Sequence, residues 1–334
     1  MSISIKTKLF ISKSTNPWFN LAYEEQLVGE VAEDEIYLYL WQNQHTVVIG
    51  KHQNPWREVL VSELEADGGK VARRLSGGGA VYHDLGNVNF TFVMHKKHED
   101  LHRQLKVIVD GVKALGIEAE FSGRNDILAE GRKFSGNAFY HGKTNYYHHG
   151  TILVDVDMTK LGRYLNVSMK KLNAKGVESV KSRVINLKEL NPELTINSVM
   201  MAVGEAFESE YGKADELFTI SEENAPTGAL ERYKHYASWE WLYGKTPNFD
   251  VTFEEKFTWG ELVLSFKLKG AVIEDSGVYS DAMSTDLVDA LKDVFTGKRL
   301  ERVELSNALK NASVDASMRE PFLEIANWIE TLAI

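Results

Sequence analysis

The sequence predicts an α+β fold built on a mostly antiparallel sheet with flanking helices, followed by a small α+β C-terminal accessory domain. Short β-rich runs bounded by turn formers outnumber the helical segments, and the two do not alternate regularly as in a doubly wound fold. Turn formers at residues 244–250, Gly-Lys-Thr-Pro-Asn-Phe-Asp, follow a cluster of aromatic residues and indicate a boundary. We therefore expect two domains, at residues 1–245 and 250–334.

Helices are predicted first where Asn-Pro pairs precede apolar residues at helical spacing. Asn16-Pro17 introduces a helix over residues 18–31, and Asn54-Pro55 introduces another that runs through Leu64. A third helix is expected at residues 99–115. The C-terminal domain should contain helices near residues 285–295 and 319–332.

Strands are predicted from short runs rich in β-branched and aromatic residues. The polar connection Gln-Asn-Gln-His joins two of these runs and predicts that they form a hairpin. We expect strands with tight turns to dominate the rest of the first domain. The predicted strands are residues 36–41, 46–50 (the hairpin partners), 71–74, 88–94, 132–140, 146–155, 257–269 and 271–279.

Composition excludes several classes of function. The chain has 334 residues, 43% of them hydrophobic, but no apolar run long enough to cross a bilayer, so we expect a globular cytoplasmic protein without a membrane role. With no cysteine it cannot form disulfides, thiolate metal sites or a cysteine thioester. A formal net charge of −10 disfavours a general role in nucleic-acid binding.

A run of three glycines between two predicted strands is the most unusual stretch. Residues 73–84 read Arg-Arg-Leu-Ser-Gly-Gly-Gly-Ala-Val-Tyr-His-Asp. Because Gly77, Gly78 and Gly79 lack Cβ atoms, their backbone amides can approach an anion closely, and Arg73 and Arg74 add charge suited to phosphate or carboxylate. The lysine and hydroxyl of a P-loop are missing, and a strand follows in place of a helix.

A second stretch places a lysine among small polar residues. It contains Gly-Arg-Asn-Asp-Ile at 123–127 and Lys-Phe-Ser-Gly-Asn-Ala at 133–138. Strict alternation in a strand would put Lys133, Ser135 and Asn137 on one face, and Phe134, Gly136 and Ala138 on the other. A lysine with such neighbours has room for a ligand.

Three further patterns need separate interpretation. A basic segment at residues 175–184 is a candidate for closing over a bound nucleotide. His98-Glu99-Asp100-Leu101-His102 matches the zincin pattern, but nothing supplies a third ligand and we do not expect a metalloprotease. His148 and His149 are adjacent in a predicted strand, so only one of them can face a site.

These motifs, in this order, resemble the lipoate-protein ligase A family. The resemblance rests on residues 73–84, 123–127 and 133–138, on His-Gly-Thr-Ile-Leu at 149–153, and on Ser-Val-Lys-Ser-Arg-Val-Ile-Asn at 179–186. It implies the biotin/lipoate protein ligase fold, which is related to class II aminoacyl-tRNA synthetase cores. It also implies ATP-dependent formation of lipoyl-AMP, followed by transfer of the lipoyl group to a lysine of an acceptor protein.

The same resemblance implies roles for particular residues. Lys133 would contact ATP, the adenylate and the lipoyl carboxylate as the catalytic residue, and Asp126 would be a partner of Mg²⁺. The acceptors implied are apo lipoyl domains of 2-oxoacid dehydrogenase complexes and the glycine cleavage H protein, served by a monomeric enzyme. The remaining residues predicted to bind the nucleotide and substrate are Arg74, Gly77, Gly78, Gly79, Ala80, Val81, Tyr82, Asn125, His149 and Thr151.

Alternative functions differ in the chemistry they require. An octanoyl or lipoyl transferase of the same fold passes its acyl group through a cysteine thioester, and this chain has no cysteine. A biotin ligase would resemble this fold, but the motifs resemble the lipoate branch and lack the arginine-rich glycine loop typical of biotin enzymes. A non-catalytic paralogue that binds the lipoyl group or its carrier remains open, although Lys133, both arginines and the glycine run are intact.

Overall fold

The computed structural model divides the chain into two compact units and describes all but residues 1–4, 123–125, 166–182, 245–249 and 333–334. The first unit comprises Met1–Ile49, Pro55–Arg74 and Ala80–Leu242. The second comprises Tyr243–Ile334 with two short segments, Gly50–Asn54 and Leu75–Gly79. Most of the predicted boundary lies outside the described residues, so the division at 245/250 stays a prediction.

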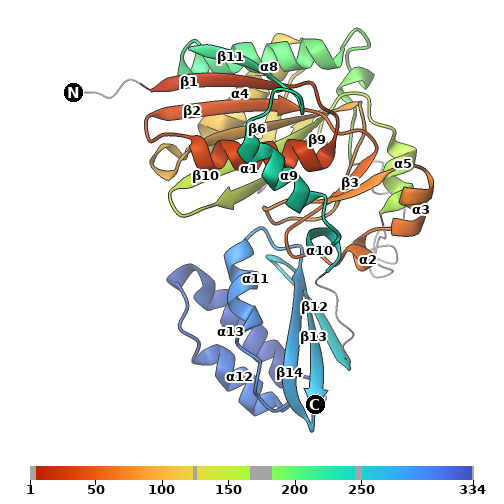
Figure 1. The fold of residues 1–334 in the computed structure, drawn as a ribbon, viewed down its shortest axis with the longest axis vertical. Coiled ribbons are helices and arrows are strands. Elements are labelled where there is room, and N and C mark those ends of the chain that lie inside the picture. Colours follow the sequence, from red (N-terminus) through yellow and green to blue (C-terminus); the bar gives the residue numbers. More distant parts are fainter. Residues whose placement is uncertain (1–4, 123–125, 166–182, 245–249, 333–334) are drawn as a thin grey trace. The chain divides into compact units, whose positions relative to one another are not determined.

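An eight-stranded sheet forms the centre of the first unit (Figure 1). β1 pairs in parallel with both β11 and β2, and every other neighbouring pair is antiparallel. The predicted α+β class with a mostly antiparallel sheet is therefore confirmed. In sheet order the strands are β11 (Glu216–Ile220), β1 (Lys6–Ser12), β2 (Glu35–Trp41), β6 (Asn87–His95), β10 (Asn145–Leu153), β9 (Arg132–His141), β8 (Asp126–Ala129) and β7 (Glu120–Ser122).

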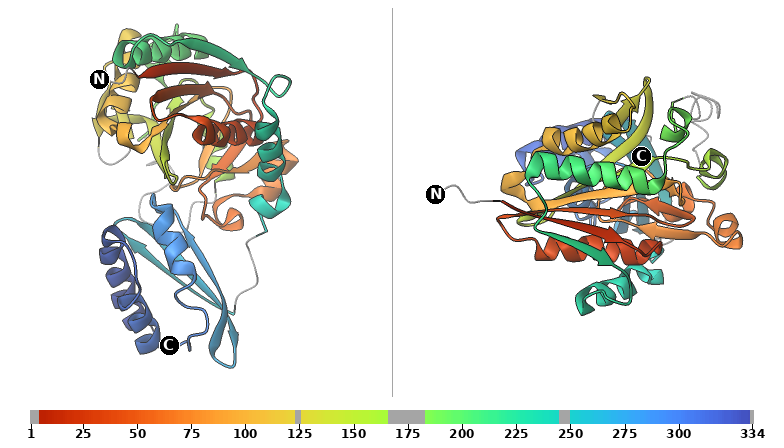
Figure 2. Two further views of the ribbon diagram at one scale, coloured as in Figure 1. Left: turned by 60° about the vertical axis from the view of Figure 1, so that its left-hand side comes forward. Right: turned by 90° about the horizontal axis from the view of Figure 1, so that it is seen from above.

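Helices cover both faces of this sheet (Figure 2). α4 (Leu101–Ala114) packs beside α8 (Ile196–Tyr211) on one face, and α1 (Pro17–Glu30) packs beside α9 (Thr227–Tyr236) on the other. The start of α1 is as predicted: the Asn16 side chain accepts a hydrogen bond from the Trp18 amide at 3.3 Å, and Pro17 is the first helical residue.

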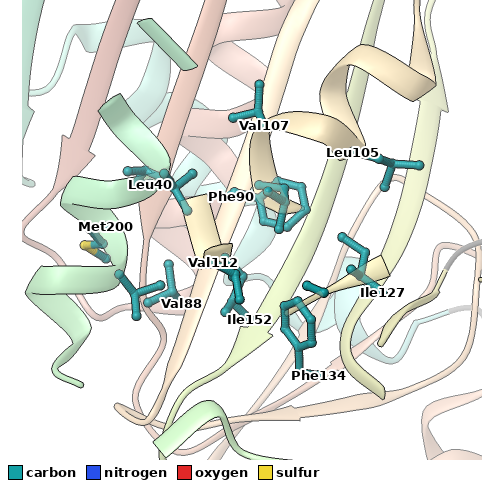
Figure 3. Packing of buried hydrophobic residues seen from close by; sticks show 14 of the residues in the cluster. Leu40, Val88, Phe90, Leu105, Val107, Val112, Ile127, Phe134, Ile152 and Met200 are labelled. Atoms are coloured by element: carbon teal, nitrogen blue, oxygen red, sulfur yellow. The ribbon is translucent and has the colours of Figure 1, made fainter. Parts of the chain in front are cut away.

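The apolar core lies between the sheet and the α4–α8 pair. Phe90 and Ile152 project from the strands toward Leu105 and Val112 of α4, and Met200 of α8 closes the cluster (Figure 3). Alternate residues of β6 explain this asymmetry. Val88, Phe90 and Phe92 belong to this core, whereas Asn87, Asn89 and Thr91 lie on the opposite face, where Thr91 bonds to Glu24 of α1. The sheet thus has one apolar face and one face lined with buried polar groups.

The predicted hairpin of residues 36–41 and 46–50 is wrong. Both runs are strands, but β2 is already paired with β1 and β6, and β3 (Thr46–Ile49) belongs to a separate three-stranded sheet. There β3 pairs in parallel with β4 (Lys70–Arg73) and antiparallel with β5 (Val81–His83). His45 has a φ of 43° in the short connection, which redirects the chain from one sheet to the other.

Other helices also differ from expectation. The helix predicted from Asn54 to Leu64 is two shorter ones, α2 (Pro55–Glu58) and α3 (Val61–Ala66). The rest of the first domain is not dominated by strands, because α8 alone spans 16 residues. The remaining helices that the structure describes in this unit are α5 (Met158–Tyr164), α10 (Trp239–Leu242) and the 3₁₀ turns η1 (Lys96–His98) and η2 (Leu187–Glu189).

The second unit packs helices against a three-stranded antiparallel sheet, β12 (Val251–Phe257), β13 (Gly260–Lys269) and β14 (Val272–Ser280). Its core is separate and includes Leu264, Phe266, Leu291 and Phe322. The helices are α11 (Thr285–Lys292), α12 (Arg302–Lys310) and α13 (Ala316–Glu330), of which α12 was not predicted, nor was β12 as a separate strand. Among the helices that the structure describes, none has the length and hydropathy of a membrane span.

His148 is a fully buried imidazole on the core face of β10. Its Nδ1 lies 2.9 Å from Gln104 Oε1, its Nε2 lies 2.8 Å from Asn137 Oδ1, and Phe92 stacks on the ring. Burial lowers the pKa of His148 from 6.5 to about 3. The neutral ring is therefore the native form at every pH near neutrality.

Acidification should destabilise the fold through this histidine. Below pH 6.5 the unfolded chain binds a proton at His148 and the native chain does not, so the free energy of unfolding falls as pH falls toward 3. Between pH 6 and 4 this contributes about 1.4 kcal/mol per pH unit. Urea unfolding across this range should give a slope shallower by about that amount for His148→Gln. An unchanged slope would contradict a neutral buried His148.

Candidate active site

A β-bulge in β9 turns Lys133 toward the polar face of the sheet. Ile127 pairs with Ser135 but Leu128 pairs with Lys133, so β9 carries one extra residue at Phe134. The predicted strict alternation is therefore wrong: Ser135 and Asn137 keep to the core side, whereas Lys133 joins Gly136. Without this bulge the lysine would point into the apolar core.

Lys133 forms an ion pair with Asp126, and the end of its side chain lies over Gly136. Its Nζ is 2.6 Å from Asp126 Oδ1, and both side chains are about one third exposed, at 35% and 38%. A Cβ built on Gly136 would lie 2.9 Å from the same Nζ. Thr151, on the adjacent strand, accepts a hydrogen bond from the Gly136 amide at 3.3 Å. Three predicted site residues, Lys133, Asp126 and Thr151, therefore meet here.

His149 lies two residues before Thr151 on the same face and contacts a buried carboxylate. Its Nδ1 is 2.8 Å from Glu24 Oε1, and that oxygen also accepts a hydrogen bond from the Thr91 hydroxyl at 2.7 Å. Trp41 Nε1 donates to the same hydroxyl at 3.1 Å. The two adjacent histidines lie on opposite faces of the sheet, as strand alternation predicted. Glu24 was not predicted, because a glutamate in a helix normally lies on its solvated face.

Arg74 is buried beside this network. Its guanidinium donates to the Val48 carbonyl at 3.1 Å, and its backbone amide donates to Ile49 O at 3.0 Å. Burial lowers its pKa to about 10, partly offset by Tyr147 and Glu24, so Arg74 stays charged at neutral pH. The neighbouring arginine, Arg73, points elsewhere.

Arg73 holds a helix in place. Its Nε and Nη2 donate to the carbonyls of Trp241 and Leu242, at 2.9 and 2.8 Å, and Trp241 Nε1 donates back to Arg73 O at 3.1 Å. These contacts fix the end of α10. The side chain therefore has a structural role that its position beside the glycine run did not indicate.

Three buried polar atoms near this network have no hydrogen-bond partner within the described part of the chain: Asn87 Oδ1 and Asn89 Nδ2 on β6, and His83 Nε2 on β5 of the smaller sheet. Burial and the nearby Arg74 charge lower the pKa of His83 to about 3, so its ring is neutral. Unsatisfied groups of this kind are the positions at which a bound ligand or water supplies the missing hydrogen bonds.

The three glycines belong to the second unit and differ in their surroundings. A Cβ on Gly77 would lie 2.2 Å from Ala282 O, so that residue must be glycine for close packing within this unit. Gly78 has a φ of 89° and donates its amide to Ala282 O at 3.1 Å. Nothing lies within 4 Å of a Cβ built on Gly79. Of the three, only Gly79 is exposed to solvent.

The residues that follow return to the first unit. Ala80 precedes β5, and Val81 and Tyr82 pair with β3 in that strand. The Tyr82 hydroxyl is 2.8 Å from His45 Nδ1 and its ring packs on Tyr164, so this side chain is part of the protein interior. Any contact of Tyr82 with a ligand would involve its backbone.

Some predicted residues are not placed. Asn125 and residues 175–182 of the basic segment lie outside the described residues. At the zincin-like motif, His141 Nε2 pairs with Glu99 Oε1 at 2.9 Å. Within the described ranges, no three His, Cys, Asp or Glu side chains gather as a metal site.

A hollow of about 670 Å³ opens elsewhere in the first unit. Its wall includes His45, Lys70, Lys160 and Arg163, and none of the predicted site residues lines it. The chemistry-bearing residues are instead gathered on the sheet face described above. There a partly exposed ammonium group and a buried guanidinium provide fixed positive charge for an anionic ligand, next to unsatisfied polar groups.

Two family models match this chain. Residues 16–208 match the family model of the lipoyl protein ligase A/B catalytic domain, and residues 246–329 match that of the bacterial lipoate protein ligase C-terminus. A relative from Psychrobacter cryohalolentis, lipoate-protein ligase A, is 41% identical over 308 residues, which cover 90% of this chain and 91% of the relative.

Two solved structures are similar over most of their length. The crystal structure of P. falciparum LipL1 in complex with lipoate is 31% identical with a TM-score of 0.85, covering 98% of this chain and 100% of that one. A lipoate-protein ligase A bound with ATP is 26% identical with a TM-score of 0.61, covering 71% of this chain and 98% of that one. The predicted family is confirmed: the chain belongs to the lipoate-protein ligase family.

Proposed function

We propose that this protein is an ATP-dependent lipoate-protein ligase. It activates lipoate with ATP to lipoyl-AMP and transfers the lipoyl group to a specific lysine of an acceptor protein. The observation that carries this proposal is the bulge that places Lys133 beside Asp126 and Thr151 on the polar face of the sheet. The family match and the likeness to ligases with lipoate or ATP bound support it.

In the first half-reaction, a carboxylate oxygen of lipoate attacks the α-phosphorus of ATP. The new C–O–P bond gives lipoyl-AMP, and the bond to the β-phosphate breaks with release of pyrophosphate. Two anions must approach each other, and negative charge grows on the α-phosphate oxygens. Lys133 would hold both reacting groups with its ammonium group, exchanging its contact with Asp126 for contacts with the ligand.

Other residues would hold the rest of the nucleotide. We assign Arg74, the backbone of Gly77 to Tyr82, and Asn125 to contacts with ATP or the adenylate. His149 and Thr151 would border the same ligand. Gly79 is the most accessible of the three glycines, because its Cα faces open space.

Mg²⁺ would accompany ATP to this site. A single carboxylate, Asp126, suits it, because protein-bound Mg²⁺ commonly takes one or two carboxylates together with phosphate oxygens. When bound, the ion neutralises charge on the departing pyrophosphate.

In the second half-reaction, the acceptor lysine attacks the carbonyl carbon of the adenylate. A C–N bond forms, AMP leaves with the bonding electron pair, and the amine loses a proton. No enzyme nucleophile is needed because the mixed anhydride is already activated. We propose apo lipoyl domains of 2-oxoacid dehydrogenase complexes and the glycine cleavage H protein as acceptors, modified in the cytoplasm by a monomer.

The direct test is the intact mass of a purified apo lipoyl domain after incubation with the enzyme, lipoate and Mg-ATP. We expect a gain of one lipoyl group that requires ATP. A matched acceptor with its target lysine changed to arginine should gain nothing. A gain without ATP, when a lipoyl or octanoyl thioester replaces the free acid, would favour the transferase. No gain with ATP and either lipoate or octanoate would favour a binding-only paralogue.

Lys133→Ala should abolish adenylate formation. Loss of a preorganised donor costs on the order of 3 kcal/mol, so pyrophosphate release should fall more than a hundredfold. Lys143→Ala is a matched control, because Lys143 is an exposed lysine at the turn between β9 and β10. Near wild-type pyrophosphate release by Lys133→Ala would show that the catalytic assignment is wrong.

A further inference from the structure

We propose that Gly136 is a positioning residue for Lys133. Its missing side chain leaves the space in which the lysine ammonium lies, so residue 136 sets where the charge meets the ligand. This inference rests on the proposed function for its kinetic consequences, whereas its geometry can be tested without any reaction.

The backbone of Lys133 cannot move to make room. Its amide donates to Arg183 O at 2.7 Å, and its carbonyl accepts from the Ile185 amide at 2.9 Å. Together these two hydrogen bonds form a parallel bridge between Lys133 and Val184. On the other side, Lys133 pairs with Leu128 across the bulge. Because the strand is held at both edges, a change at Gly136 must be absorbed by the lysine side chain.

The space above Gly136 is occupied by the end of that side chain. A Cβ there would lie 2.9 Å from Lys133 Nζ and 3.0 Å from Lys133 Cε, and its third neighbour, Thr151 Oγ1, is 4.0 Å away. Non-bonded carbon contacts are comfortable only near 3.5 to 4.0 Å. An alanine methyl would therefore displace the ammonium by at least several tenths of an ångström, away from its 2.6 Å contact with Asp126.

The fold itself would accept alanine at this position. Gly136 does not have a positive φ, and no backbone atom is among the neighbours of the added Cβ. Alanine also costs less conformational entropy than glycine in a strand. Gly150, on the opposite face, is different, because a Cβ there would lie 2.5 Å from the Phe90 ring. The absence of a side chain at residue 136 thus makes room for the Lys133 side chain and is not needed for close packing of the backbone.

Gly136→Ala should impair adenylation without destabilising the protein. Misplacement of a reacting group by 1 Å can cost about a hundredfold in rate, so we expect kcat for pyrophosphate release to fall tenfold or more. The KM for ATP should change less than threefold, and the midpoint of thermal unfolding should stay the same or rise. Gly29→Ala is the matched control, because its added methyl meets only Arg232 Nη2 at an ordinary 3.8 Å.

A double-mutant cycle separates an effect through Lys133 from a direct one. The residual kcat for pyrophosphate release is measured for wild type, Gly136→Ala, Lys133→Ala and the double variant. If Gly136 acts through the lysine, adding Gly136→Ala to Lys133→Ala changes the residual kcat less than twofold. A further tenfold loss in the double variant would overturn the proposal, as would wild-type kcat in Gly136→Ala.

Lysine reactivity provides a readout that needs no substrate. Acylation of Lys133 by an N-hydroxysuccinimide ester, followed by peptide mass spectrometry, should change at least threefold in rate in Gly136→Ala, while Lys188 reacts as in wild type. An unchanged Lys133 rate would refute the positioning role. If the wild type makes no acyl-adenylate, the proposed function fails, and this reactivity still decides the question of Gly136.

Discussion

The site face of the sheet depends on one buried carboxylate, that of Glu24. A buried charge costs several kcal/mol unless its oxygens are hydrogen-bonded, and Glu24 Oε1 is bonded to both His149 and Thr91. These partners come from β10 and β6, so the carboxylate ties α1 to the two central strands. Arg74 adds opposite charge nearby. A polar face can therefore exist inside the first unit, because hydrogen bonds and opposite charge from other elements stabilise the buried carboxylate.

The bulge at Phe134 solves a second problem on the same sheet. β9 must supply apolar groups to the core and a cation to the polar face. With strict alternation, Lys133 would share a face with Ser135 and point into the core. The extra residue lets Phe134 and Ser135 stay on the core side while Lys133 and Gly136 face Thr151. Lys133 thus reaches the site from the edge of a well-packed core, and its backbone is fixed by Arg183 and Ile185.

Local patterns predicted the strands better than their partners. β6, β9 and β10 appear close to their predicted ranges because short β-rich runs and their turns are local features. The pairing of β3 with β4 and β5 depends on chain segments far along the sequence, which a polar four-residue connection could not reveal. The β-bulge in β9 could not be predicted either, because one additional residue in a strand does not change the strand's composition recognisably.

The glycines of the predicted site show why residue type alone did not settle their roles. Gly77 is required by the Ala282 carbonyl, Gly79 faces open space, and Gly136 makes room for a lysine. In the sequence all three are glycines in motifs with polar neighbours. What separates them is the nearest atom to the missing Cβ: a backbone oxygen cannot yield, whereas the end of a flexible lysine can. A glycine whose missing Cβ faces a backbone oxygen, such as Gly77, supports the fold. A glycine whose missing Cβ faces the end of a flexible lysine, such as Gly136, should accept alanine without unfolding, so its replacement tests chemistry alone.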